Sequence, residues 1–152
     1  MSEDNKALVR KIYERIWNKG DISAVDELFD AEYNDHIIEG TPGTSPGPEG
    51  FKAVINQIRT AFPDMTIKIE DMIAEGDKVV SYWTNTGTNT SGLNGMPATG
   101  KKVEMEGVDI YRIANGKVVE VWGVHDVTEL LWAYMTSVME RLGVVQPPGQ
   151  AT

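Results

Sequence analysis

The residues best placed for acid–base chemistry lie at the end of the segment GKVVEVWGVHD, residues 116–126. After the turn residue Gly116, alternating β-branched and aromatic side chains predict a strand that ends in His125 and Asp126. Alternation places Asp126 on the same face as Trp122 and His125 on the opposite face. A carboxylate beside large apolar groups loses hydration, so we expect its pKa to be raised. Asp126 is therefore a candidate general base or acid.

A structural role is the alternative for Asp126. A helical run begins directly after it, at Val127, and Asp is a common capping residue at helix N-termini. The two roles need not exclude each other. Because His125 points away from Asp126 by alternation, it ranks below Asp126 as a candidate site residue.

A second carboxylate, Asp109, lies in the predicted strand KVEMEGVDIYRI, residues 102–113. Alternation places it on a mostly apolar face with Met105, Tyr111 and Ile113. A charged group on such a face needs either a partner or a proton, which makes Asp109 a candidate site residue. The alternative is that a twist or bulge in the strand turns Asp109 to the other face.

Asp35 and His36 lie between apolar neighbours in the short extended segment EYNDHII, residues 32–38. His36 and His125 are the two histidines of the chain, and neither lies in an HxH or HxxxH spacing. We therefore predict no metal site. A histidine near the end of a strand is most often simply hydrogen-bonded, which is the structural alternative for His36.

The elements that must position these residues change from helical to strand periodicity along the chain. An apolar stripe at helical spacing predicts a first helix, in which Tyr13 and Trp17 take part, and a short second helix follows Asp21. Pro48 begins a third helix, which buries Phe62 and ends at Pro63. Period-two patterns then predict strands from residue 65 to the turn at 75–77, at 79–90, at 102–113 and at 116–126, and the last helix spans residues 127–142. Residues 39–48 and 91–100 are predicted loops, and residues 143–152 a flexible tail.

Composition limits the class of protein. A chain of 152 residues with net charge −9 indicates one acidic domain, residues 1–142, and argues against nucleic-acid binding. The absence of cysteine excludes disulfides, thiolate metal sites and a cysteine nucleophile. The first residues lack the apolar core of a signal peptide, and no apolar run reaches the roughly 18 residues of a membrane span. We therefore expect a cytoplasmic protein without a membrane partner.

Three helices followed by a strand meander indicate an α+β fold in which helices cover one face of a curved antiparallel sheet. Such packing leaves a pocket between the helices and the sheet, suited to a small hydrophobic molecule. The aromatic residues Trp17, Phe62, Trp83 and Trp122 either line this pocket or belong to the core.

Several segments together resemble the SnoaL-like polyketide cyclases of the nuclear transport factor 2-like superfamily. They are NKGDISAVDELF followed by EYNDH, then AFPDMTIKIEDMIAEGDKVV, GTNTSGLNGMPATGKKV and GVDIYRIANGKVVEVWGVHD. The resemblance covers roughly residues 5–132. It implies a cone-shaped α+β barrel with a curved mixed or antiparallel sheet, a reaction without cofactor, and a homodimer formed through the sheet.

The resemblance also implies site residues. In these cyclases, an aspartate at the position matching Asp126 removes a proton from a carbon between carbonyls, and the enolate closes a ring by aldol attack. His36 matches a pocket-lining position, where it would relay a proton or orient the substrate. The related ketosteroid isomerases carry a tyrosine and a protonated aspartic acid at positions resembling Tyr13 and Asp109, and their base lies near Asp35.

Three hypotheses follow from these residues. The first is a polyketide-cyclase-like enzyme, of lyase or isomerase type, acting on a polycyclic or β-dicarbonyl substrate. The second is another small-molecule enzyme on this fold. Of these, an isomerase keeps Tyr13, Asp35 and Asp109, whereas the Arg-x-Asp pair of the related epoxide hydrolases is absent because Gly107 lies two residues before Asp109. The third is a non-catalytic binding or dimerisation domain.

Overall fold

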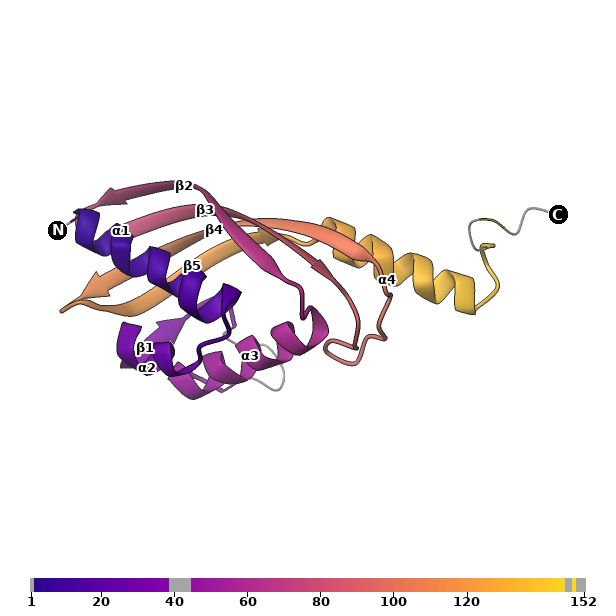
Figure 1. Ribbon diagram of the computed structural model, residues 1–152, viewed down its shortest axis with the longest axis horizontal. Helices are drawn as coiled ribbons and strands as arrows, with labels where there is room; N and C mark the ends of the chain where they lie inside the picture. Colours follow the sequence, from indigo (N-terminus) through magenta and orange to yellow (C-terminus); the bar gives the residue numbers. More distant parts are fainter. Residues whose placement is uncertain (1, 39–44, 147–148, 150–152) are drawn as a thin grey trace.

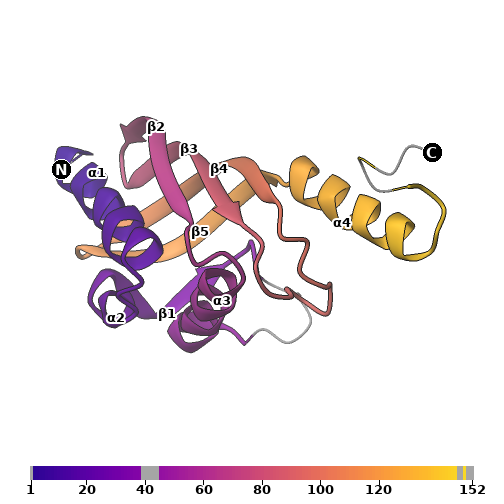
Figure 2. The same ribbon diagram turned by 45° about the vertical axis from the view of Figure 1, so that its right-hand side comes forward.

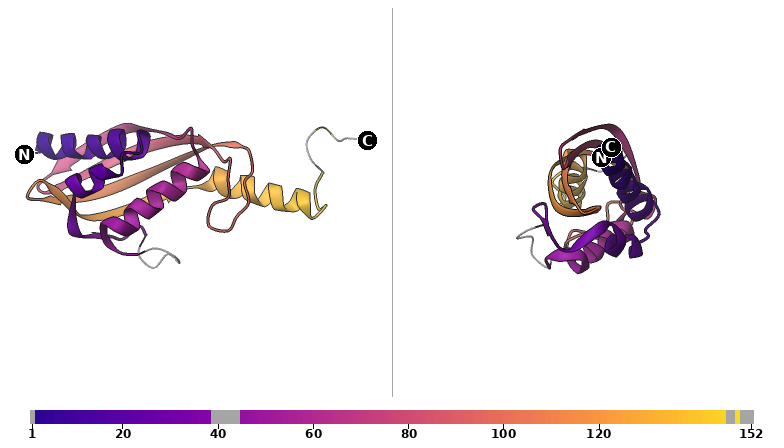
Figure 3. Two further views of the ribbon diagram at one scale, coloured as in Figure 1. Left: turned by 60° about the horizontal axis from the view of Figure 1, so that its bottom comes forward. Right: turned by 90° about the vertical axis from the view of Figure 1, so that its left-hand side faces the viewer.

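A curved five-stranded sheet forms the body of the protein, and helices from the N-terminal half cover its concave face (Figure 1). The computed structural model describes residues 2–38, 45–146 and 149. The covering segments are α1 (Ser2–Lys11), the π-helical η1 (Ile12–Asn18), α2 (Ser23–Leu28) and α3 (Gly47–Ala61). Seen along the long axis, strands and helices together form an incomplete barrel (Figure 3).

The sheet is mixed, with strand order β1-β5-β4-β3-β2. Its strands are β1 (Phe29–Asp35), β2 (Thr66–Glu75), β3 (Lys78–Thr88), β4 (Lys102–Ala114) and β5 (Lys117–Asp126). β1 pairs parallel to β5, and the other neighbours are antiparallel. The predicted α+β barrel is confirmed, and its curved sheet is mixed rather than purely antiparallel. The extended segment predicted at 32–38 is shifted: β1 begins at Phe29 and ends at Asp35, and residues 36–38 form a turn.

The first helix changes its winding where it reaches the cavity. The predicted apolar stripe is confirmed, since Val9, Ile12, Tyr13 and Ile16 are buried. From Ile12 onward the helix widens to π geometry, which periodicity does not reveal. Such π-helical turns are frequent at functional sites. Here the segment carries Tyr13 and Trp17, both of which line the cavity described below.

The β4–β5 hairpin determines which side chains face the helices. Its tight turn, Asn115-Gly116, has positive φ at both residues, 52° and 74°, as the two-residue turns of twisted hairpins require. Beyond the turn, Ile113 pairs with Val118 but Arg112 pairs with Glu120, so Val119 is an extra residue, a β-bulge. After this bulge, Val121 and His125 line the cavity, whereas Val124 is 80% exposed on the outer face.

The last helix, α4 (Thr128–Arg141), extends beyond the end of the sheet (Figures 1 and 2). One side of α4 is buried against the body through Leu130, Ala133 and Tyr134. Leu131, Trp132 and Met135 lie on its other side and are each at least half exposed, at 50%, 61% and 51%. Much of the predicted loop at 39–48 and of the predicted tail at 143–152 lies outside the described residues. No helix of the described part of the chain is long and apolar enough to cross a membrane.

Candidate functional site

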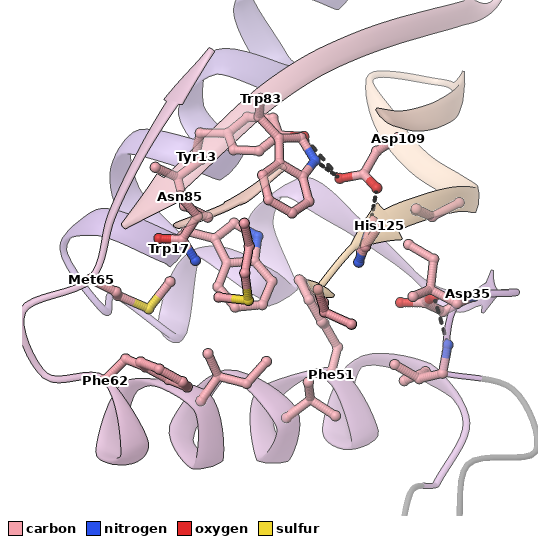
Figure 4. Close-up of a pocket in the computed structure, with 18 of the residues that line it drawn as sticks. Tyr13, Trp17, Asp35, Phe51, Phe62, Met65, Trp83, Asn85, Asp109 and His125 are labelled. Atoms are coloured by element: carbon pink, nitrogen blue, oxygen red, sulfur yellow. Dashed lines mark hydrogen bonds and ion pairs between the residues drawn. The ribbon is translucent and has the colours of Figure 1, made fainter. Parts of the chain in front are cut away.

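A cavity of about 260 Å³ lies between the helices and the concave face of the sheet (Figure 4). Its wall is mostly apolar and aromatic. Three of the four aromatic residues predicted for it, Trp17, Phe62 and Trp83, line it, together with Phe51 and Met65. The polar groups in the wall are few: Tyr13, Asp35, Asn85, Asp109, Tyr111 and His125. A mostly apolar cavity with few convergent polar groups is typical of a small-molecule site.

The strongest polar feature is a carboxylate–imidazole pair in the cavity wall. Asp109 is 6% exposed, and its Oδ1 lies 2.8 Å from Nε2 of His125. Its Oδ2 accepts hydrogen bonds from Nε1 of Trp83 at 2.8 Å and from the hydroxyl of Tyr13 at 3.0 Å. Three donors thus surround Asp109, and both of its carboxyl oxygens act as acceptors. Oδ1 of Asp109 accepts a hydrogen bond from Nε2–H of His125, which leaves Nδ1 of that ring as an acceptor on the side away from Asp109.

Two glycines allow this pair to form. A Cβ atom at Gly123 would lie 2.4 Å from Oδ1 of Asp109 and 3.0 Å from Nε2 of His125. A Cβ atom at Gly107 would lie 2.5 Å from the Trp83 ring and 2.7 Å from the His125 ring. Those two rings pack edge to face with centroids 4.9 Å apart. Gly107, which stands where the epoxide hydrolases have the arginine of their Arg-x-Asp pair, is therefore required for the packing of these two rings.

Tyrosine hydroxyls extend the network behind Asp109. The hydroxyls of Tyr13 and Ser81 are 2.7 Å apart, and Tyr111 donates to the Tyr13 oxygen at 3.1 Å. Burial, with the charge of Asp109 as the second cause, raises the pKa of Tyr13 well above its usual value. Tyr13 therefore remains a neutral donor, which fixes the orientation of Asp109.

Asp35 supplies a separate carboxyl group to the wall. It is 8% exposed and accepts hydrogen bonds from the backbone N–H of Ile37 at 2.9 Å and from the Tyr33 hydroxyl at 3.2 Å. Burial raises the pKa of Asp35, although the backbone donors oppose that shift. Tyr13, Asp35 and Asp109, the three isomerase-like candidates, thus share one cavity.

The structure places Asp126 outside the cavity, and the expectation of a raised pKa is wrong. Asp126 is exposed at the start of α4, where its Oδ1 accepts hydrogen bonds from the Thr128 hydroxyl at 2.5 Å and the Thr128 backbone N–H at 2.9 Å. These two bonds lower its pKa. The structural alternative is only partly met: Asp126 holds the first residue of the helix, Thr128, but the N-cap residue of α4 is Val127, which makes no side-chain capping hydrogen bond.

His36 and Trp122 lie on the outer face of the sheet and do not line the cavity, which corrects the prediction for both residues. Their rings stack with centroids 5.1 Å apart. Nε2 of His36 lies 2.8 Å from Oε1 of Glu120, whose Oε2 accepts a hydrogen bond from Nε of Arg112 at 2.9 Å. These hydrogen bonds lower the pKa of Glu120, and the bond with His36 contributes more than the bond with Arg112.

His125, ranked low from the sequence, occupies the position expected for Asp126. The reason is the bulge at Val119. Pairing continued without it from Ile113 and Val118 would place Trp122 opposite Asp109, and opposite residues share a face. With the extra residue, Gly123 lies opposite Asp109, and His125 opposite Gly107. A shift of one residue exchanges the two faces of a strand.

Among residues 2–38, 45–146 and 149, no group of three or more His, Asp or Glu side chains is arranged to hold a metal ion. The polar side chains that line the described cavity can donate and accept hydrogen bonds and transfer protons. A histidine oriented by a buried carboxylate is a suitable group to take a proton from carbon and return it to oxygen.

Comparison with known proteins agrees with this geometry. The family model for the SnoaL-like polyketide cyclases matches residues 7–133. Aklanonic acid methyl ester cyclase DnrD of Streptomyces peucetius is 32% identical over 114 residues, 73% of this chain and 77% of that protein. Nogalonic acid methyl ester cyclase of Streptomyces nogalater is 31% identical over 104 residues, 67% of this chain and 76% of that protein.

A solved structure extends the comparison to the fold. TsrD of Streptomyces laurentii superposes with a TM-score of 0.78 at 25% identity, covering 88% of this chain and 96% of TsrD. The sheet order, the helices over its concave face and the cyclase relatives lead to one conclusion. The chain belongs to the SnoaL-like polyketide cyclase family.

Proposed function

We propose that the protein is a cofactor-independent cyclase that closes a ring by intramolecular aldol addition within a hydrophobic β-dicarbonyl substrate. The observation that carries the proposal is the contact between the buried carboxylate of Asp109 and the partly exposed imidazole of His125, 2.8 Å apart, in the wall of an apolar cavity. Its cyclase relatives act, by their names, on methyl esters of aklanonic and nogalonic acid. We extend to this chain the class of substrate that these names indicate.

The first step is removal of a proton. A carbon between two carbonyls is already acidic, so a single positioned base suffices. Nδ1 of His125 accepts the proton, while Asp109 holds the opposite nitrogen and stabilises the imidazolium that forms. The Asp109 carboxylate and the His125 imidazolium together then carry no net charge, and the negative charge lies on the enolate.

The second step forms the ring. The enolate carbon attacks a ketone carbon of the same molecule, a carbon–carbon bond forms, and the ketone oxygen becomes an alkoxide. The imidazolium of His125 returns its proton to this alkoxide. Product and substrate therefore have the same composition, and no external oxidant, reductant or water is consumed. The apolar wall formed by Phe51, Phe62 and Trp83 would hold the chain folded for this attack.

Double-bond isomerisation of a ketosteroid is the second candidate, because Tyr13, Asp35 and Asp109 line the same cavity. That mechanism needs Tyr13 and a protonated Asp109 as donors to a substrate oxygen. In this structure the Tyr13 hydroxyl already donates to Asp109, which also accepts from Trp83. Asp109 thus acts as an acceptor, which favours the cyclase.

The test is turnover of aklanonic acid methyl ester and nogalonic acid methyl ester, followed by chromatography, with a 3-keto-Δ5 steroid as the isomerase substrate. His125→Asn should lower cyclisation by about 10²- to 10⁴-fold, the usual contribution of a general base. The protein should also exchange deuterium at the dicarbonyl carbon of a substrate analogue without the ketone, and His125→Asn should not. Steroid isomerisation without cyclisation would refute the cyclase proposal, and so would cyclisation unaffected by His125→Asn.

A further inference from the structure

One polar side chain in the cavity wall has no part in the proposed chemistry. Asn85 lies on β3 with its side chain toward the helices, and it is 5% exposed (Figure 4). Its Oδ1 is buried and, within the part of the chain that the structure describes, has no hydrogen-bond partner. An unsatisfied amide of this kind destabilises a folded protein, and native structures contain few of them.

The position of Asn85 relative to the base is set by the sheet register. Asn85 pairs with Met105, while Trp83 pairs with Gly107, which in turn lies opposite His125. The row of side chains that contains Asn85 is thus two residues, about 7 Å, from the row that contains Trp83 and His125. A flat molecule with its reacting carbon at His125 would extend along the cavity toward Asn85.

We propose that Asn85 is a specificity residue that binds an oxygen substituent on the substrate at the end remote from the reacting carbon. An amide can donate from Nδ2 or, turned over, accept at Oδ1, so it binds either a ring carbonyl or a ring hydroxyl. This inference rests on the proposed function. It narrows the substrate class to ring-bearing β-dicarbonyl compounds with a second oxygen function, held between His125 and Asn85.

The chain contains a matched control for this residue. Asn89 directly follows the last residue of β3. It is 0% exposed and also has a buried Oδ1 without a partner among the described residues. Its Nδ2 donates to the Tyr134 hydroxyl at 2.6 Å, and it does not line the cavity. Asn89 therefore shares the burial of Asn85 but has a structural contact in place of access to a ligand.

The experiment measures binding of two naphthalenes of similar size, 2,6-dihydroxynaphthalene and 6-methyl-2-naphthol, by calorimetry. Each has one hydroxyl for the His125 end, and they differ in the group that reaches the other end. The wild-type protein should bind the diol about tenfold more tightly, the value of one hydrogen bond to an otherwise unsatisfied group. Asn85→Leu should bind the two equally, within about twofold, whereas Asn89→Leu should keep the preference.

Thermal unfolding without ligand separates a binding role from a structural one. Asn85→Leu should unfold at the wild-type temperature or higher, because an unsatisfied amide is removed, while Asn89→Leu should unfold at a lower temperature. The inference is overturned if Asn85→Leu keeps the preference for the diol, if it destabilises the protein as Asn89→Leu does, or if the wild-type protein binds neither compound. Because binding requires no turnover, a protein that prefers the diol but cyclises nothing would refute the proposed function and leave the assignment of Asn85 standing.

Discussion

The sheet carries a histidine–carboxylate pair on each face, and the two pairs have the same separation. Inside, His125 and Asp109 lie 2.8 Å apart, and outside, His36 and Glu120 lie 2.8 Å apart. The Glu120 side chain is 22% exposed and shares its charge with Arg112, whereas the Asp109 side chain is 9% exposed and is held by neutral donors. Distance alone therefore does not distinguish the pair that we propose as catalytic from a surface contact.

The surroundings of each imidazole make the difference. The His36 ring stacks on Trp122, which also lies under Nζ of Lys78 at 5.5 Å from its ring centroid. The outer pair thus belongs to a charged surface network that links β1 to β4 and β5. The His125 ring instead packs edge to face against Trp83 at the wall of the cavity. A base needs both an orienting partner and access to a substrate, and only the inner pair combines them.

Replacing the two carboxylates should give the largest contrast. In Asp109→Asn, the amide can turn its Nδ2 toward His125, so the ring exchanges its tautomer and Nδ1 no longer accepts a proton from the substrate. We expect cyclisation to fall by about 10²- to 10⁴-fold. The matched change on the outer face, Glu120→Gln, should leave activity within about twofold. Initial rates of both variants on the same methyl ester check this, and equal losses would remove the distinction between the pairs.

A smaller effect is expected when the space for the inner pair is reduced. In Gly123→Ala the new Cβ would lie 2.4 Å from Oδ1 of Asp109, so the pair must separate. We expect activity to fall by about tenfold or more, and stability to fall by about 1–3 kcal/mol from overpacking. Val124→Ala, at the neighbouring exposed position, is the control and should change neither quantity appreciably. Urea unfolding together with initial rates measures both, and a fully active Gly123→Ala would show that the pair can be dispensed with.

Asp35 is a buried carboxyl group that, unlike Asp109, is not paired with an imidazole in the described part of the chain, and we expect it to lower the stability of the folded protein at neutral pH. Its folded pKa is raised by burial, so the folded state binds a proton more readily than the unfolded state does. This group therefore favours folding at low pH and disfavours it as pH rises through the folded pKa. Asp35→Asn should raise the Tm by a few degrees at pH 7, and the gain should disappear in acid. Calorimetry from pH 4 to pH 8 tests this, and an unchanged pH profile would contradict it.

The contribution of the outer pair to stability should depend on pH in the opposite sense to that of Asp35, and this is the smallest effect that we expect. Hydrogen bonds from His36 and Arg112 lower the folded pKa of Glu120, so its contribution to stability is present above the unfolded pKa. That contribution is lost as pH falls through the folded pKa. Glu120→Gln should therefore lower the Tm slightly at pH 7 and not at all in strong acid, and salt should weaken the difference. A larger Tm difference in acid than at pH 7 would refute this assignment.

The architecture could be predicted from the sequence because each element has a clear period. The helical stripe through Ile12 and Ile16, the alternation through Val79, Ser81, Trp83 and Asn85, and the turn at Gly116 are all found as expected. The burial of Asp109 followed from the same alternation, because β4 is regular between Met105 and Tyr111. These residues lie in stretches where local propensity and tertiary packing agree.

The site was only partly predictable because two irregular features lie next to it. Alternation correctly separated His125 from Asp126, but it contains no information about which face the helices cover. That choice depends on the extra residue Val119, and β-bulges are not visible as a period. The π-helical turn at Ile12–Asn18 is likewise set by packing. Asp126 was misplaced for a further reason: the same residue type serves well as a cap and as a base.

The bulge at Val119 has a consequence for how such a site can diverge. A point substitution in β5 replaces one side chain, but deletion of a single residue at the bulge would restore simple pairing and exchange the faces of everything after it. Trp122 and Asp126 would then turn toward the helices, and His125 toward solvent. Loss of one codon would thus replace the imidazole that we propose as the base with a carboxylate, without altering any residue at the end of the strand. Alignments of related cyclases across this hairpin should therefore be anchored separately at the turn and at the start of α4, because a gap between them changes which residues are comparable.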